Sequence, residues 1–208
     1  RGIRDWSYHP AGLPLLQEGI AICLIDGPGQ GESRLFHGLY LTPRFVEDFA
    51  LLVAHLKAHP ALGDSVGVFG NSLGGTLAAT VTAEVEGIGA CCVNGGSIAP
   101  AETSDRFPRL LDKIGAMMGV EDRSSALGLL EGMNLRGRTG AIRCPLLVLH
   151  GGADPLFPPE SAQAIHDEAT SEHKQMVVWD DGDHCIYNHA FERNAITAEW
   201  FAAHLKRS

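Results

Sequence analysis

The chain has 208 residues, and its formal net charge is −9. This length predicts one domain with a substantial hydrophobic core. The acidic balance argues against a nucleic-acid partner, which would need a basic face, and apolar runs no longer than a strand argue against a membrane-spanning helix and a membrane partner.

Strand-like and helix-like segments alternate along the chain. Short apolar runs are expected as strands at residues 20–25, 65–69, 88–93, 146–150 and 175–179. The expected helices are one that begins at Thr42–Pro43 and ends before Pro60, and others at residues 73–85, 159–169 and 190–205. This alternation predicts an α/β fold in which helices flank a mostly parallel sheet on both faces.

The alternation stops between residues 100 and 143. Strand-like runs are missing there, and two amphipathic helical pieces are expected near residues 107–118 and 124–133. The alternative interpretation is an ordinary crossover connection, but the segment is longer than a crossover needs. We expect a short helical lid inserted into one catalytic domain of residues 1–208. Its expected apolar walls are Phe107, Leu111, Met117 and Met118.

Residues 70–75 carry the sharpest signal, because they read Gly-Asn-Ser-Leu-Gly-Gly and match the pattern Gly-x-Ser-x-Gly. They stand between an expected strand and an expected helix, the context in which this pattern carries a nucleophilic serine. The turn crowds the backbone and favours glycine at its flanks, and the helix N-terminus favours negative charge. We expect Ser72 to be the nucleophile and the N–H of Leu73 to face the oxyanion. A mere glycine-rich turn is the alternative.

A serine hydroxyl needs a base, and the base needs an orienting acid. His184 follows the last expected strand, and Asp154 follows the strand at residues 146–150. The order along the chain is then nucleophile, acid and base, at strand ends where parallel sheets build their sites. We expect the carboxylate of Asp154 to bind the ring of His184. A turn aspartate before proline and a solvated loop histidine are the alternatives.

Other acidic residues compete with Asp154 for this role. They are Asp180, Asp181 and Asp183, which stand next to His184, and Glu102 and Asp105, which follow the preceding strand. The three neighbours of the histidine cannot easily reach around to its ring nitrogen. Glu102 is therefore the more serious rival.

We expect neither a cofactor nor a metal. Residues 26–33 look like a nucleotide-binding loop, but the third glycine of that pattern would fall at Glu32, so a structural loop is the better interpretation. His55 and His59 lie four residues apart on an expected helix, but no His-Glu-x-x-His pattern is present.

The chain has five cysteines, an odd number, without a zinc-type Cys-x-x-Cys pair. Cys23, Cys91 and Cys92 lie in apolar runs, so buried free thiols in a reducing cytoplasm are the expected state. Cys185 follows His184 directly, and we interpret it as a packing residue because no means of activating its thiol is visible.

Four motifs together resemble one branch of the α/β-hydrolases. They are Asp-Gly-Pro-Gly-Gln-Gly-Glu-Ser at 26–33, Gly-Asn-Ser-Leu-Gly-Gly at 70–75, His-Gly-Gly-Ala-Asp at 150–154 and Gly-Asp-His-Cys at 182–185. The branch includes 2,6-dihydropseudooxynicotine hydrolase, the fungal heptaketide hydrolases and esterases similar to the fermentation-respiration switch protein. The resemblance covers nearly the whole chain. It implies an α/β-hydrolase fold and a triad of Ser72, Asp154 and His184.

Members of this branch carry a long N-terminal region with the first strands of the sheet. The resemblance places the start of this chain near the oxyanion loop, with Ile3 as the second oxyanion donor. It also implies that one further strand lies in the sheet between the strand at residues 20–25 and the strand at residues 65–69. That strand would precede the oxyanion loop in the chain, and nothing in residues 1–19 reads as it. We therefore expect a fragment with a missing partner beside residues 20–25. Its open apolar edge should aggregate or recruit another chain, for example as a homodimer.

The leading hypothesis is a cytoplasmic serine hydrolase that acts on a small molecule without a cofactor. By the resemblance, some members cleave esters and others cleave a carbon–carbon bond next to a ketone. Both chemistries would pass through an acyl-enzyme on Ser72. The alternative is a non-catalytic ligand-binding homologue or a truncated, inactive one. The presence of all three triad residues favours the first hypothesis, and the missing strand favours the second.

Overall fold

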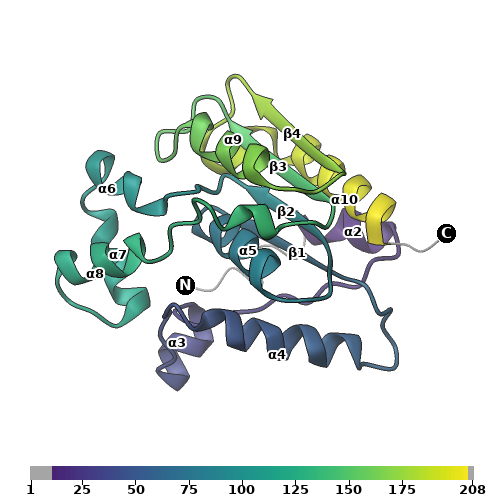
Figure 1. The fold of residues 1–208 in the computed structure, drawn as a ribbon, viewed down its shortest axis with the longest axis horizontal. Coiled ribbons are helices and arrows are strands. Elements are labelled where there is room, and N and C mark those ends of the chain that lie inside the picture. Colours follow the sequence, from purple (N-terminus) through teal and green to yellow (C-terminus); the bar gives the residue numbers. More distant parts are fainter. Residues whose placement is uncertain (1–10, 206–208) are drawn as a thin grey trace.

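The computed structural model describes residues 11–205, which form helices around one parallel sheet (Figure 1). The strands are β1 (Val66–Asn71), β2 (Ile88–Asn94), β3 (Leu146–Gly151) and β4 (Lys174–Trp179). The helices are α2 (Leu13–Gln17), α3 (Gly31–His37), α4 (Phe45–Lys57), α5 (Leu73–Glu84), α6 (Thr103–Arg106), α7 (Leu110–Met118), α8 (Arg123–Glu131), α9 (Pro159–Glu168) and α10 (Ala190–Leu205). Short 3-10 helices are η2 (Pro100–Glu102), η3 (Thr139–Ala141) and η4 (His184–His189).

The strands follow one another in the order β1-β2-β3-β4, and every neighbouring pair is parallel. Parallel neighbours need a crossover connection. Helix α5 supplies it between β1 and β2, the α6–α8 segment between β2 and β3, and α9 between β3 and β4. The expected parallel sheet flanked by helices is confirmed.

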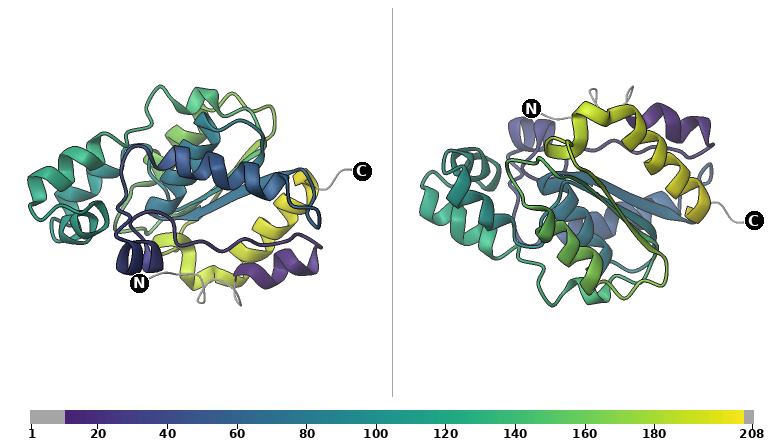
Figure 2. Two further views of the ribbon diagram at one scale, coloured as in Figure 1. Left: turned by 90° about the horizontal axis from the view of Figure 1, so that it is seen from below. Right: turned by 90° about the horizontal axis from the view of Figure 1, so that it is seen from above.

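Alternation along the central strands divides the core into two layers. Cys91 and Val93 of β2 pack in one cluster with residues of α5 and α9, whereas Ala90 and Cys92 pack in another with Phe201 of α10. Figure 2 shows the same division, with α5 and α9 on one side of the sheet and α2 and α10 on the other. A strand buried on both faces is apolar throughout, which explains the continuous apolar runs in the sequence.

Residues 20–25 are not a strand, contrary to expectation. The segment is extended, and its burial alternates between half-buried and exposed residues. It has no ladder partner among the described residues, and it lines the same cavity as β1, which is the outermost strand on that side of the sheet. An apolar run becomes a strand only when a neighbour accepts its backbone hydrogen bonds, so the sequence pattern alone gave the wrong answer here.

Two further boundaries differ from the expectation. The loop expected at residues 26–33 turns into a helix at Gly31, where α3 begins. Helix α4 begins at Phe45 rather than at Thr42–Pro43, because residues 43–44 form a turn before it. The fold and the strand order are unaffected by either shift.

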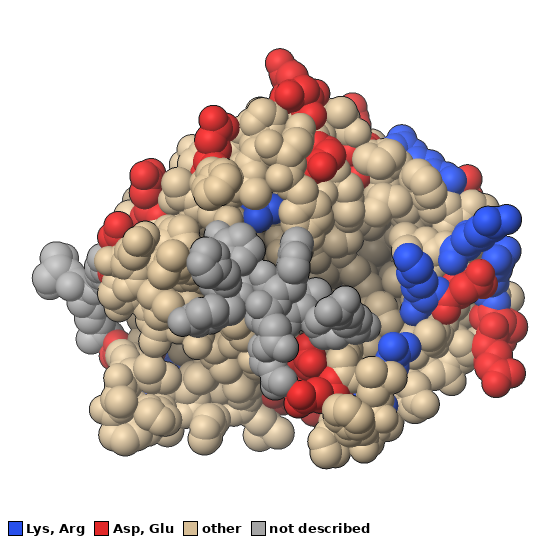
Figure 3. All heavy atoms as spheres, turned by 180° about the vertical axis from the view of Figure 1, so that it is seen from behind, with Lys and Arg blue, Asp and Glu red and all other residues tan. Residues whose placement is uncertain are grey.

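No helix within residues 11–205 is long and apolar enough to cross a membrane. On the face shown in Figure 3, acidic side chains are spread around the outline and basic side chains gather at one side, next to a hollow in the surface.

Candidate active site

Ser72 lies between the end of β1 and the start of α5. Its φ of 58° and ψ of −130° fall in a region that non-glycine residues rarely adopt, at a cost of about 1–3 kcal/mol. The N–H of Ser72 donates to the carbonyl of Asn94, at the end of β2, over 2.8 Å. The neighbouring strand therefore holds the strained serine in place.

Close packing explains one of the two glycines that flank the serine. A Cβ added at Gly70 would lie 1.9 Å from the carbonyl oxygen of Gly74, where no atom fits. A Cβ added at Gly74 would meet no heavy atom within 4 Å. The expectation that crowding demands glycine on both sides holds for Gly70 and is wrong for Gly74.

His184 reaches Ser72 from the far end of the chain. It is the first residue of η4, just after β4, and its side chain is 19% exposed. The ring Nε2 lies 2.8 Å from the Oγ of Ser72, and the ring Nδ1 lies 2.7 Å from the Oδ2 of Asp154. The histidine thus connects a hydroxyl with a carboxylate, as a general base requires.

A sharp turn after His184 sets the position of its ring. Cys185 and Ile186 have φ values of 62° and 58°, which are unfavourable for residues with a Cβ. The carbonyl of Cys185 accepts hydrogen bonds from the side chains of Arg193 at 2.7 Å and Asn94 at 3.1 Å. These two buried donors stabilise the strained turn.

Asp154 uses both of its carboxylate oxygens. Oδ2 accepts the hydrogen bond from His184, and Oδ1 accepts from the backbone N–H groups of Leu156 at 2.7 Å and Phe157 at 3.2 Å. The side chain is fully buried in the turn after β3. The predicted contact between Asp154 and the ring of His184 is confirmed.

Opposite forces act on the pKa values of this pair. Burial alone would raise the pKa of Asp154, but the hydrogen bonds from His184, Leu156 and Phe157 outweigh it and lower the pKa. Burial would lower the pKa of His184, but its hydrogen bond to Asp154 outweighs burial and raises the pKa to about 9. Both shifts favour a charged carboxylate beside an imidazolium.

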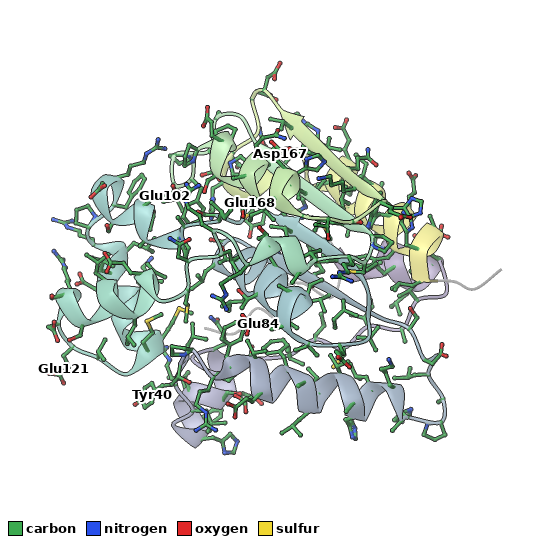
Figure 4. All side chains as sticks on the ribbon, in the orientation of Figure 1. Tyr40, Glu84, Glu102, Glu121, Asp167 and Glu168 are labelled. Carbon is green, nitrogen blue, oxygen red and sulfur yellow. The ribbon has the colours of Figure 1, made fainter. Side chains whose placement is uncertain are left out.

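The structure separates the rival acids from His184. Glu102 accepts a hydrogen bond from the Oγ of Ser97 at 2.6 Å, and Figure 4 shows it where the chain leaves the sheet toward α6. Asp181 binds the ring of His189, and Asp183 accepts from the backbone N–H of Tyr187 inside η4. None of these carboxylates is paired with the His184 ring.

Of the two expected oxyanion donors, Leu73 and Ile3, the structure describes only Leu73. Leu73 is the first residue of α5, and the N–H groups of a first helical turn have no acceptor within the helix. Its N–H therefore needs no acceptor within α5, and its role as an oxyanion donor stays a prediction. Ile3 lies outside the described residues.

A cavity of about 1160 Å³ opens beside Ser72. Its lining is mainly apolar and comes from residues 20–30, α4, β1, α7 and the turn that carries Leu156 and Phe157. A cavity of this size, with few polar groups next to a reactive side chain, suits a small organic ligand.

The segment of residues 100–143 reaches this cavity, but with other side chains than expected. Only Met117 of the four expected wall residues lines it, together with Leu110 and Ile114 of the same helix. Leu111 and Met118 are buried in the cluster that joins α7 to α4 and α8, and Phe107 is exposed. The spacing i, i+4, i+7 identifies the stripe that faces the cavity; the sequence did not show which of two apolar stripes faces which neighbour.

Sequence reasoning missed two residues beside the candidate triad. His150, the last but one residue of β3, is completely buried, and its Nε2 lies 3.8 Å from the Oδ2 of Asp154. Phe157 contacts the His184 ring, with ring centroids 5.9 Å apart. His150 opens the motif at residues 150–154, so its place in that motif was the available signal. Among residues 11–205, no group of three or more potential ligands could hold a metal ion.

Comparison with known proteins identifies relatives over most of the chain. A family model described as serine aminopeptidase, S33, matches residues 5–120 and 124–190. The 2,6-dihydropseudooxynicotine hydrolase of Paenarthrobacter nicotinovorans is 28% identical over 204 residues, which are 95% of this chain and 53% of that protein. The chain therefore spans about half the length of this relative.

A crystal structure titled as the 2,6-dihydroxy-pseudo-oxynicotine hydrolase superposes with a TM-score of 0.87 at 26% identity, covering 97% of this chain and 57% of the other. A monoacylglycerol lipase of Mycolicibacterium smegmatis is 24% identical over 95% of this chain and 84% of its own length. The expected α/β-hydrolase fold, and the branch to which the motifs pointed, are confirmed by these matches.

Proposed function

Because the chain belongs to the α/β-hydrolase family described as serine aminopeptidase, S33, we propose that it is a serine hydrolase acting on a small molecule. The observation that carries the proposal is the position of His184, 2.8 Å from the hydroxyl of Ser72 and 2.7 Å from the carboxylate of Asp154. A hydroxyl, an imidazole and a buried carboxylate, joined in this order by hydrogen bonds, are the parts of a nucleophilic triad.

The reaction begins when the Oγ of Ser72 attacks a carbonyl carbon and His184 Nε2 takes the hydroxyl proton. Asp154 stabilises the imidazolium, and the N–H of Leu73 binds the negative oxygen of the tetrahedral intermediate. The proton passes from His184 to the leaving group as its bond to the carbonyl carbon breaks. Water, deprotonated by His184, then releases the acyl group from Ser72.

The leaving group distinguishes the two forms of this proposal. An ester releases an alkoxide, which takes the proton from His184 and leaves as an alcohol. A carbon–carbon bond next to a ketone releases a carbanion, or an enolate where the leaving fragment carries a carbonyl group of its own, and this fragment takes the same proton from His184. The relatives include a monoacylglycerol lipase and a 2,6-dihydropseudooxynicotine hydrolase, and the mainly apolar cavity beside Ser72 suits the organic part of either substrate.

The proposal places the protein in the cytoplasm, gives it no cofactor, and includes its assembly as a homodimer. All five cysteines are free thiols, which supports a reducing compartment. Cys91, Cys92 and Cys185 are buried, whereas Cys23, which was expected to be buried, is exposed.

The test is labelling of the full-length protein with a fluorophosphonate, which reacts with activated serines. We expect one label, on the peptide that contains Ser72, and loss of both labelling and activated-ester hydrolysis in Ser72→Ala. A matched control is Ser125→Ala, at an exposed position on α8. A protein that is not labelled, or a Ser72→Ala variant with normal turnover, would support the non-catalytic alternative.

A further inference from the structure

His150 is the buried titratable group next to the triad that the proposed chemistry does not use. It lies near the end of β3, and none of its surface is exposed. The ring Nε2 is 3.2 Å from the carbonyl oxygen of Phe157. The ring Nδ1 is buried and has no hydrogen-bond partner among the described residues.

These contacts determine the protonation state of the ring. A carbonyl oxygen only accepts, so Nε2 of His150 carries the proton and donates it to Phe157. Nδ1 is then a bare lone pair, because a second proton there would be a buried positive donor without an acceptor. Burial also lowers the pKa of His150, in agreement with a neutral ring.

Phe157 connects His150 to both Asp154 and His184. Its N–H donates to the Oδ1 of Asp154 over 3.2 Å, and its ring lies against the ring of His184 at an interplanar angle of 58°. A shift of Phe157 would therefore move the carboxylate and the imidazole together. The hydrogen bond from His150 fixes the carbonyl at the end of that same short turn.

Charge explains why a neutral donor suits this place. The Nε2 of His150 lies 3.8 Å from the Oδ2 of Asp154, the same oxygen that accepts from His184. A permanent cation at His150 would attract that oxygen and weaken its hold on the imidazolium of His184. A neutral N–H supports the turn and leaves the charge of Asp154 to His184.

We propose that His150 is a positioning residue, which holds the Asp154–Phe157 turn through the Phe157 carbonyl and thereby aligns Asp154 with His184. This inference rests on the proposed function. It adds a fourth residue that acts through the other members of the site and touches no substrate.

The test is a matched pair of substitutions in the full-length protein. Gln in His150→Gln reaches as far as the imidazole Nε2 and keeps an N–H donor, whereas Met in His150→Met has a similar length and shape and donates nothing. His55→Met, at an exposed position on α4, controls for the loss of a histidine as such. The readouts are kcat and KM for p-nitrophenyl butyrate, the rate of fluorophosphonate labelling, and the pH profile of kcat/KM.

We expect His150→Met to lower kcat about tenfold with KM within about twofold, because one buried hydrogen bond that aligns the base is lost. The apparent pKa of His184 should fall in the same variant, since a misaligned Asp154 stabilises the imidazolium less. His150→Gln should retain kcat within about threefold and keep the pH profile. If the Met variant does not fold, His150→Asn replaces it, because its amide is too short to reach the Phe157 carbonyl.

Equal kcat values for the Gln and Met variants, or a Met variant with wild-type kcat and pH profile, would overturn the positioning role. The proposed function itself would fail on a different result, in which the unsubstituted protein neither hydrolysed the ester nor reacted with the fluorophosphonate. The two failures are therefore distinguishable in one set of measurements.

Discussion

The pKa of His184 determines how the proposed activity depends on pH. A base must be neutral to accept the proton of Ser72, and with a pKa of about 9 only about one ring in a hundred is neutral at pH 7. We expect kcat/KM to increase with pH, to reach half of its maximum near pH 9 and to level off only above that pH. A profile of kcat/KM between pH 6 and 10 checks this, and an inflection near 6.5 would contradict it.

The same shift has a consequence for stability. Folding raises the pKa of His184 from 6.5 to about 9, so the folded state binds this proton more tightly than the unfolded chain. The stabilisation is complete below pH 6.5 and is lost as the pH rises through about 9. The best pH for the proposed activity is therefore one at which this contribution to stability is disappearing.

Asp154 can be separated from its neighbours by a single substitution. Asp154→Asn removes the charge that stabilises the imidazolium of His184, so we expect the apparent pKa of His184 to fall and kcat to decrease at least about a hundredfold. The control is Asp181→Asn, which disturbs only the pair with His189 on the protein surface. Similar kinetics for both variants would show that Asp154 does not orient the base.

At the scale of elements, the β1–α5 junction offers a matched pair of glycine substitutions. Gly70→Ala would press a methyl group against the Gly74 carbonyl, and we expect a large loss of thermal stability. Gly74→Ala adds a methyl group to α5 in open space, and we expect a gain of about 0.5–1 kcal/mol because alanine favours helix. Thermal melting of both variants measures the difference; equal melting temperatures would argue against the described geometry of the turn.

Helix α7 presents two apolar stripes with different tasks. Leu111 belongs to the cluster that joins α7 to α4 and α8, so Leu111→Ala should lower the free energy of unfolding by about 2–4 kcal/mol. Its neighbour Leu110 lines the cavity and is only partly buried against the same cluster, so Leu110→Ala should lower stability less than Leu111→Ala and shift the preference of the protein toward longer p-nitrophenyl esters. Denaturant unfolding and a series of ester chain lengths check the pair, and reversed effects would contradict our assignment of the stripes. Such a result would also remove support for a lid at residues 100–143.

At the scale of the whole molecule, the outer edge of β1 is the feature from which we predict association. Among the described residues it has no strand partner, and the apolar segment 20–25 lies across a cavity from it. Unpaired apolar edges attract other chains, so we expect the 208-residue chain, expressed by itself, to self-associate. Ile25→Lys, which places a charge on an exposed residue of that segment, should reduce association more than His55→Lys on α4. Sedimentation velocity measures the association of each variant. A monodisperse monomer of the unsubstituted 208-residue chain would contradict the prediction.

The sequence determined the parts of this protein that depend on local pattern. Alternating strand and helix signals predicted that the strands of the sheet are parallel, and the spacing of residues 70–75 identified the turn at Ser72. Chain order favoured Asp154 and His184 as acid and base, because strand ends in a parallel sheet meet at one edge. Each of these signals is read from short segments and from their order along the chain, without knowledge of which segments pack together.

Only the tertiary structure decided features that depend on neighbours far apart in the chain. Residues 20–25 have the composition of a strand, but within residues 11–205 no strand lies beside them to accept their hydrogen bonds. The stripe of α7 that faces the cavity depends on where α4 and α8 lie, and the choice of Asp154 over Glu102 depends on which carboxylate reaches the ring of His184. The same holds for His150, because its contact with the Phe157 carbonyl exists only once the turn after β3 is folded. Composition and spacing fix the local form of a segment, whereas contacts between distant segments fix what that segment pairs with.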